Sequence, residues 1–141
     1  MDTAPVTPMT VTRAITLELI DQSGSATPLA AQLCYDKSDP YAVTASFVTG
    51  PTEVRWVFAR ELLAEGLYEP TGDGDVHVWP CIDARGSAVT ILELTSPDGE
   101  ALMQARSRDL TEFLANTETL VPAGSESDFV DFTAALQDLL R

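Results

Sequence analysis

Few residues in this chain of 141 could carry out chemistry: there is one histidine, His77, and there are two cysteines, Cys34 and Cys81. A catalytic triad would have to be assembled around His77 without a GxSxG nucleophile motif. Neither cysteine has a cation or a histidine in its motif to activate the thiol. We therefore interpret His77 as a strand residue facing solvent or an acidic or tyrosine neighbour, and both cysteines as small apolar packing residues.

The acidic segment Gly72-Asp73-Gly74-Asp75 suggests two kinds of site, a calcium loop or a carboxylate pair for acid-base catalysis. It lacks the ligand spacing of a calcium loop and the distal bidentate glutamate, and it has no phosphate-loop signature. Two glycines and two aspartates in four residues are typical of a hairpin turn. We expect a turn with no metal and no cofactor, and we keep an enzyme using Asp73 and Asp75 as the alternative.

The charge of the chain restricts its partners. Asp and Glu number 22 and Lys and Arg number 8, so the formal net charge is −14. The aromatic residues Trp56, Phe58 and Trp79 could form a stacking platform for single-stranded nucleic acid. That function also needs clustered cations, whereas Lys37 is the only lysine and the seven arginines are scattered. We expect no nucleic-acid binding and interpret these aromatics as core or inter-subunit packing.

Period-2 alternation of apolar residues predicts a series of strands joined by short turns. A short helix over 59–65 interrupts the series, with Gly66 in the left-handed position that ends a helix. The turn over 70–75 separates this helix from a second hairpin. The predicted strands are 11–19, 29–36, 42–49, 53–58, 76–82 and 87–95.

Beyond residue 99 the period changes to that of a helix. Between 100 and 117 an apolar stripe is formed by Leu102, Met103, Leu110, Phe113 and Leu114. Arg106 lies within this stripe, where its head would pair with Asp109 one turn on or form an ion pair at an interface.

A last helix carries a second apolar stripe, which we select with Arg106 as the candidate partner or oligomer interface; intramolecular packing is the alternative. Its members are Phe129, Phe132, Leu136, Leu139 and Leu140.

These elements predict an α+β fold: an antiparallel sheet of about seven strands with a short central helix and two C-terminal helices. Residues 9–141 are expected to form a single domain after a flexible lead-in, 1–8. The N-terminus has no basic start and no apolar run of signal-peptide length, and no stretch approaches the roughly 20 apolar residues of a membrane span. We expect a cytoplasmic protein without membrane insertion.

Several sequence phrases go beyond what composition supplies, and together they resemble the SsgA-like proteins of sporulating actinomycetes. The resemblance extends from about residue 11 to 140. The phrases are YDKSDPYAV (35–43), VRWVFARELL (54–63), EGL (65–67), GDGDVHVWP (72–80) and SPDGEA (96–101).

The resemblance implies a curved sheet of the whirly type and a homotrimer. It also implies a non-enzymatic regulator of sporulation septation that recruits the tubulin-like division protein FtsZ to septum sites, with an SsgA-type paralogue as a localising partner. The whirly architecture is associated with single-stranded DNA binding, which is the alternative function. The shortage of clustered cations argues against that alternative.

Overall fold

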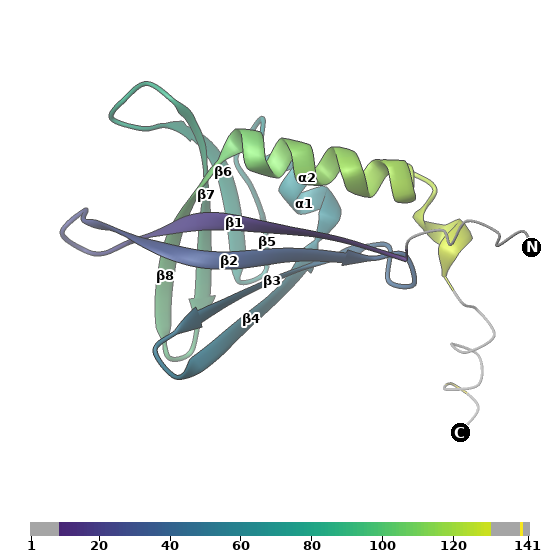
Figure 1. Ribbon diagram of the computed structural model, residues 1–141, viewed down its shortest axis with the longest axis horizontal. Coiled ribbons are helices and arrows are strands. Elements are labelled where there is room, and N and C mark those ends of the chain that lie inside the picture. The colour runs from purple at the N-terminus through teal and green to yellow at the C-terminus, as the bar shows by residue number, and fades with distance from the viewer. Residues whose placement is uncertain (1–8, 131–138, 140–141) are drawn as a thin grey trace, which may run out of the picture.

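The computed structural model describes residues 9–130 and residue 139, and Figure 1 shows one curled antiparallel sheet with two helices. The strand order is β4-β3-β2-β1-β8-β7-β6-β5. The elements are β1 (Thr10–Ile20), β2 (Ala26–Asp36), β3 (Ala42–Thr49), β4 (Thr52–Ala59), α1 (Arg60–Gly66), β5 (Thr71–Asp73), β6 (Val76–Ile82), β7 (Ala88–Ser96), β8 (Gly99–Arg106), α2 (Ser107–Leu120) and the 3-10 helix η1 (Glu126–Phe129).

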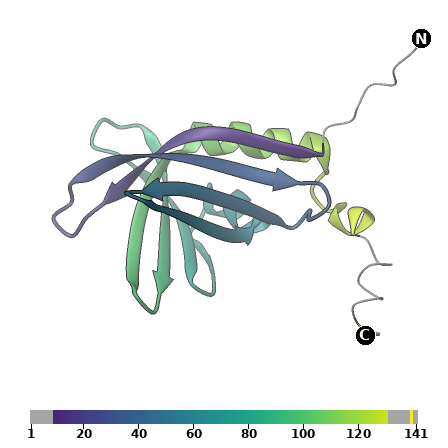
Figure 2. The same ribbon diagram turned by 60° about the horizontal axis from the view of Figure 1, so that its bottom comes forward.

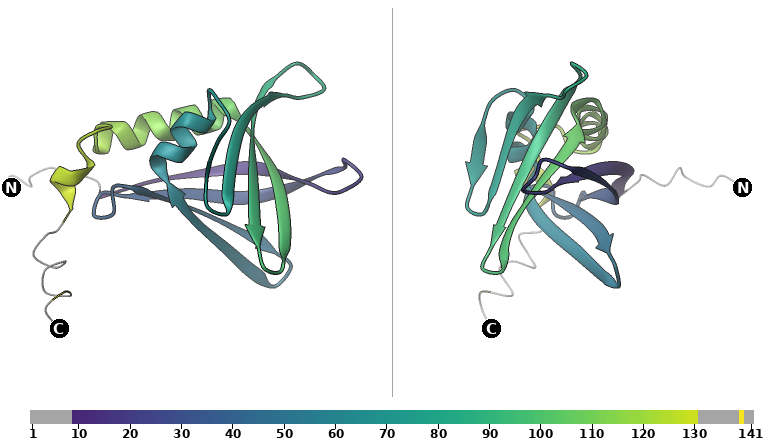
Figure 3. Two further views of the ribbon diagram at one scale, coloured as in Figure 1. Left: turned by 180° about the vertical axis from the view of Figure 1, so that it is seen from behind. Right: turned by 90° about the vertical axis from the view of Figure 1, so that its left-hand side faces the viewer.

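The sheet consists of two meanders that meet where β1 and β8 are adjacent. Strand β1 pairs with β2 along its whole length, but with β8 only through Glu18, Leu19 and Ile20. The two meanders therefore diverge from this short junction, as Figures 2 and 3 show from other sides. Helix α2 packs on β1, β7 and β8, and α1 packs on β4, β5 and β6.

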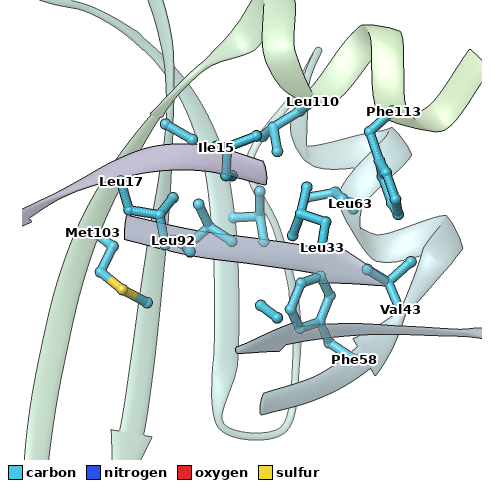
Figure 4. Packing of buried hydrophobic residues seen from close by; sticks show 14 of the residues in the cluster. Ile15, Leu17, Leu33, Val43, Phe58, Leu63, Leu92, Met103, Leu110 and Phe113 are labelled. Carbon is cyan, nitrogen blue, oxygen red and sulfur yellow. The ribbon is translucent and has the colours of Figure 1, made fainter. Parts of the chain in front are cut away.

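The core lies on the face of the sheet that the helices cover. Alternate residues of the strands point inward, such as Leu17 in β1 and Val43 in β3, and they belong to one buried cluster with Phe113 of α2 and Leu63 of α1 (Figure 4). Fully buried aliphatic side chains contribute roughly 1.5–3 kcal/mol each relative to exposure. The α+β class predicted from the sequence is confirmed, with eight strands in place of about seven.

The segment that follows Gly99 corrects the sequence prediction, because 100–106 forms strand β8 and not the start of a helix. It pairs with β7 from Ser96↔Gly99 to Val89↔Arg106, and Met103 and Ala105 alternate into the core. Pairing with a neighbouring strand has overridden the helix propensity of this sequence. The later part of the predicted stripe, Leu110 and Phe113 among it, is confirmed as the buried face of α2.

Gly66 has a role other than the predicted one. It is the last residue of α1, and the residue after it, Leu67, has right-handed helical angles. A Cβ on Gly66 would lie 2.5 Å from Cβ of Val78 in β6. The glycine therefore allows α1 to approach the sheet closely. Gly66 is not among the glycines with a positive φ. Gly74 is one of them, with φ of 60°, and it lies in a β5–β6 turn that is tighter than the predicted 70–75 loop.

Candidate partner-binding site

The path of the chain towards the C-terminal stripe is set by one buried arginine. Arg60 follows β4 directly and is 4% exposed. Its Nη1 donates to the carbonyl oxygens of Val121 at 2.7 Å and Thr117 at 3.3 Å, at the end of α2. Its guanidinium lies 4.9 Å from the ring centroid of Tyr35. Arg60 thus supplies a donor to the Val121 carbonyl, just beyond the end of α2, and a second donor to the Thr117 carbonyl, which also accepts from the backbone N–H of Val121 at 2.8 Å.

The same arginine also holds η1. Nη2 of Arg60 donates to Oε1 of Glu126 at 2.6 Å, and Oε2 of Glu126 accepts from the backbone N–H of Gly124 at 2.9 Å. The hydrogen bond from Arg60 lowers the pKa of Glu126 below the usual glutamate value. We name Tyr35, Arg60, Thr117, Val121 and Glu126 the C-terminal anchor.

Phe129 is the member of the predicted interface stripe that the anchor positions. It is half-buried against the core, and Nζ of Lys37 lies 5.1 Å from its ring centroid. Leu139 is 80% exposed. Phe132, Leu136 and Leu140 lie outside the described residues. The structure thus supports an intramolecular contact for Phe129 and an exposed side chain for Leu139.

Arg106 is separate from this region. It ends β8 and is exposed, whereas Phe129 follows the other end of α2. Helix α2 has 14 residues, so it spans roughly 20 Å at 1.5 Å per residue. The predicted pairing of Arg106 with Asp109 is wrong, because Asp109 accepts a hydrogen bond from Nη2 of Arg13 at 3.3 Å. Arg106 and Phe129, two of the predicted residues, therefore lie beyond opposite ends of α2.

Arg106 instead lines a cleft between the β1–β2 and β6–β7 hairpins. The cleft holds about 900 Å³, and its charged lining comprises Glu18, Asp83, Arg85, Arg106 and Asp109. Asp83 accepts from the backbone N–H groups of Ser87 and Arg85 at 2.9 Å each, and the Ser87 bond is the largest cause of its lowered pKa. The acidic and basic groups nearly balance, so the cleft itself has no strong preference for an anion or a cation.

His77 lies in β6 opposite Glu93 of β7, and its Nδ1 is 3.9 Å from Oε1 of Glu93. The acidic neighbour was one of the predicted environments. Both side chains line a hollow of about 390 Å³ with Trp79 and Pro70. Asp73 and Asp75 do not line it; they are exposed on either side of Gly74, so the predicted hairpin turn is confirmed.

The remaining candidate residues divide between core and surface. Phe58 is buried and Trp56 packs against the core, as expected, whereas Trp79 is half-buried in the hollow beside His77. Cys34 is half-buried, but Cys81 is exposed, so the prediction that both cysteines pack inside is wrong for Cys81. Its strand β6 pairs with β5 only up to Val78, which leaves Cys81 beyond the end of that pairing.

Sequence reasoning missed Arg60, which organises the anchor. Its partners Thr117, Val121 and Glu126 are 57 to 66 positions away. No local pattern links such residues. The one available signal is an arginine directly after an apolar strand, within the phrase WVFARELL, since a charged residue at such a position is a candidate for a buried, paired charge.

Within residues 9–130 and at residue 139 we found no group of three or more His, Cys, Asp or Glu side chains placed to hold a metal ion. None of the helices in that part of the chain has the length and apolar character needed to span a membrane.

Comparison with known proteins places this fold among characterised relatives. The model of the family described as Streptomyces sporulation and cell division protein, SsgA, matches residues 29–126. The sporulation-specific cell division protein SsgB of Streptomyces coelicolor is 48% identical over 132 residues, covering 93% of this chain and 96% of that protein. The SsgB protein of Thermobifida fusca is 44% identical, covering 92% of this chain and 94% of its own.

Two solved structures have the same fold. A structure from work on SsgB mutations that correlate with longitudinal cell division during sporulation of Streptomyces coelicolor superposes with a TM-score of 0.81 at 46% identity, covering 88% of this chain and 99% of its own. The crystal structure of an SsgA-like sporulation-specific cell division protein from Thermobifida fusca gives a TM-score of 0.82 at 40% identity, with 98% of both chains covered.

Proposed function

Because the chain belongs to the SsgA family of sporulation and cell division proteins, we propose that it is a non-enzymatic regulator that binds FtsZ, recruits it to sporulation septum sites and supports its assembly. A role in cell division follows from the family itself. Within the family, the sequence phrases resemble the SsgB type most, and SsgB proteins are among the similar relatives. The FtsZ contact, the septum location and the cytoplasmic compartment are parts of the proposal. Its main support is a likeness that extends over nearly the whole chain.

The chemistry of the described residues agrees with a binding role. Asp73 and Asp75, the pair considered for catalysis, are exposed on a turn outside both the cleft and the hollow. The net charge of −14 gives the surface a strong negative field, which disfavours polyanions and favours partner surfaces carrying cations.

Four of the seven lysine and arginine side chains among the described residues are engaged within the molecule, which argues against nucleic-acid binding. Arg13, Arg60 and Arg108 each form an ion pair with an acidic side chain. Lys37 lies over the Phe129 ring. Phosphate contacts require clustered, available cations. We therefore retain protein binding as the proposed function.

We place the FtsZ contact on the C-terminal stripe that follows the anchor. Phe129 is held by Lys37 and the core, and Leu139 is exposed, so the stripe begins at a fixed point and presents at least one apolar side chain to solvent. Apolar stripes of this spacing bind in hydrophobic grooves of partner proteins. Self-association into the homotrimer and contact with the SsgA-type paralogue are the other parts of this proposal.

The test measures FtsZ assembly by light scattering and co-sedimentation, with the purified full-length protein added alone and together with the SsgA-type paralogue. We expect binding and a change in polymer mass. Leu139→Asp should abolish both effects while leaving the thermal midpoint unchanged, because Leu139 is 80% exposed. Asp138→Asn is the matched control on the opposite side of the predicted helix and should bind normally. No effect of the unmodified protein on FtsZ under any of these conditions would contradict the proposal.

The septum location has its own test. A fluorescent fusion of the full chain in a sporulating actinomycete should form regularly spaced bands at the time of septation. Diffuse fluorescence throughout sporulation would contradict recruitment to septum sites. A mass measurement by light scattering after gel filtration tests the homotrimer contact, which requires a number of subunits divisible by three.

A further inference from the structure

The two edges of the sheet differ in how well they are protected against pairing with another chain. One edge ends in β5, which is three residues long, and next to it β6 contains Pro80. Short edge strands and proline both discourage the addition of a further strand. The other edge is β4, which has eight residues, Thr52–Ala59, and contains neither proline nor lysine.

Strand β4 also pairs with β3 without a β-bulge. Its eight residues pair without interruption with those of β3, from Thr49↔Thr52 to Ala42↔Ala59, so no bulge twists the edge away. In the described structure β3 is the only strand hydrogen-bonded to β4. An unbroken edge of this length exposes a row of backbone donors and acceptors, which is a template for strand addition.

The hydrogen-bond phase of β4 determines which residues present those groups. The N–H of Arg60 donates to the carbonyl of Tyr41 at 2.8 Å, one residue beyond the last pair. Because bonded and non-bonded pairs alternate in an antiparallel ladder, Phe58, Trp56 and Val54 bond to β3. The backbone groups of Glu53, Arg55 and Val57 therefore point away from β3, towards the open edge.

The side chains of these residues carry a self-complementary charge pattern. Glu53 and Arg55 are exposed, and neither forms an ion pair with another described residue. Their neighbours on β3, Val48 and Ser46, are uncharged. Both side chains are therefore available to pair with opposite charges on another molecule.

We infer that β4 pairs antiparallel with β4 of a second copy of this chain, around a two-fold axis at Val54. In this register Glu53 lies opposite Arg55 of the other copy, and Arg55 lies opposite Glu53 of the other copy. The dimer therefore contains two Glu53–Arg55 ion pairs. The outward backbone groups of these residues then form hydrogen-bonded pairs. A register shifted by one residue in each copy would place Arg55 opposite itself, which like-charge repulsion disfavours.

This contact is independent of the proposed FtsZ contact and of a trimer. A two-fold contact produces an even number of subunits: a dimer by itself, or a hexamer if a three-fold contact is present as well. Either result can be distinguished from a trimer by mass.

The first experiment uses disulfide formation in a full-length background with Cys34→Ser and Cys81→Ser. In the proposed dimer, Val54 lies opposite Val54 of the other copy in a non-hydrogen-bonded pair. The two Cα atoms of such a pair are about 4.5 Å apart, which is within the range of a disulfide. We expect Val54→Cys to give most of the protein as a covalent dimer under mild oxidation. Val57→Cys is the matched control, because it is 59% exposed but lies opposite Pro51 of the other copy. Equal or greater crosslinking of Val57→Cys would overturn the register.

The second experiment measures subunit mass across a dilution series. Glu53→Arg and Arg55→Glu should each weaken the two-fold contact by about tenfold, because each places like charges opposite one another twice. The double variant E53R/R55E restores both pairs and should associate within about threefold of the unmodified chain. A monomer or a trimer at all concentrations, or a double variant as weak as the single ones, would overturn the proposal while leaving FtsZ binding untouched.

Discussion

Arg60 shows how a single buried charge can organise chain segments far apart in sequence. It is nearly inaccessible to water, and its donors serve the end of α2 and Glu126 together. Burial of an unpaired guanidinium costs free energy, so we expect Arg60 to become buried at the same time as its hydrogen bonds to these acceptors form. The anchor therefore makes the position of residues 121–130 part of the core folding transition.

We expect Arg60→Met to lower the free energy of unfolding by about 3–5 kcal/mol, because the Val121 carbonyl and the Glu126 carboxylate lose their buried partner. Urea denaturation measures this difference. Arg108→Met is the matched control, since its ion pair with Glu112 is exposed and should contribute less than about 1 kcal/mol. Equal effects of the two substitutions would contradict the anchor.

The pH dependence of stability should carry the signature of Glu126. Its pKa is lowered in the folded state by the hydrogen bond from Arg60, so its stabilising contribution is present above the unfolded glutamate pKa. The contribution is lost as pH falls through the lower, folded pKa. Thermal midpoints of the unmodified chain and of Glu126→Gln should differ at pH 7 and converge as the pH falls below about 4. A constant difference down to pH 3 would contradict this linkage.

Gly66 illustrates the conflict between propensity and packing. Alanine is the better helix former by about 1 kcal/mol, but its Cβ would lie 2.5 Å from Cβ of Val78. We expect Gly66→Ala to lower the free energy of unfolding by about 1–3 kcal/mol, measured by urea denaturation. Glu61→Ala, at an exposed position in the first turn of the same helix, should change the free energy of unfolding by less than about 0.5 kcal/mol. Stabilisation by Gly66→Ala would show that α1 can shift away from β6.

At the scale of elements, β8 and α2 follow each other directly, with Arg106 the last residue of the strand and Ser107 the first of the helix. The strand and helix use different periods to bury their apolar residues. In β8 the inward residues are Met103 and Ala105, and in α2 they are Leu110, Phe113 and Leu114. A helical period of 3.6 residues also places Leu102 and Met103 on the same face as the apolar residues of α2. The sequence therefore predicted one helix across both segments.

That distinction is testable, because neighbouring residues point to opposite faces in a strand. Met103 is 2% exposed, and Met103→Ala should lower the free energy of unfolding by about 2–5 kcal/mol. Leu102 is partly exposed on the other face, and Leu102→Ala should cost about 1 kcal/mol or less. Urea denaturation of both variants, at matched protein concentration, measures the difference. Similar losses would favour the helical arrangement over the strand.

The C-terminal stripe can be tested at the same scale. If residues such as Phe132 and Leu136 belong to the proposed interface, Phe132→Ala and Leu136→Ala should leave the thermal midpoint nearly unchanged and reduce FtsZ binding. Core residues would instead cost about 2–5 kcal/mol each. Calorimetry together with co-sedimentation separates the two results, and a large loss of stability with intact binding would contradict the interface.

At the scale of the whole molecule, the net charge of −14 is a destabilising term that the compact state must overcome. Added salt screens repulsion between exposed carboxylates more than it weakens the buried Arg60–Glu126 pair. We expect the thermal midpoint to rise by several degrees between about 0.02 and 0.5 M sodium chloride. Calorimetry across that range measures it. A midpoint that falls with salt would mean that favourable ion pairs outweigh the repulsion.

The open sheet gives the whole molecule its second distinctive property. Because the sheet does not close into a barrel, β4 remains an edge, and its charge pattern specifies the proposed two-fold pairing. The same edge would be an aggregation risk if it accepted any strand. The opposed charges of Glu53 and Arg55 restrict the partners that fit.

The sequence by itself determined the features that depend on local order. Alternation of apolar residues predicted six of the eight strands, and helical spacing predicted the buried face of α2 from Leu110 onward. The phrases around residues 35–101 identified the family. The acidic composition predicts no nucleic-acid binding, which stays a prediction. Each of these depends on residues within a few positions of one another, where backbone geometry and side-chain period are directly readable.

Only the tertiary structure decided the features that depend on contacts between distant residues. It made 100–106 a strand because β7 was available to pair with it, and it placed Gly66 against Val78. It also brought Arg60 to Glu126 across 66 positions and separated Arg106 from Phe129 along the length of α2. The physical reason is that pairing and burial energies are non-local and exceed the differences in local propensity.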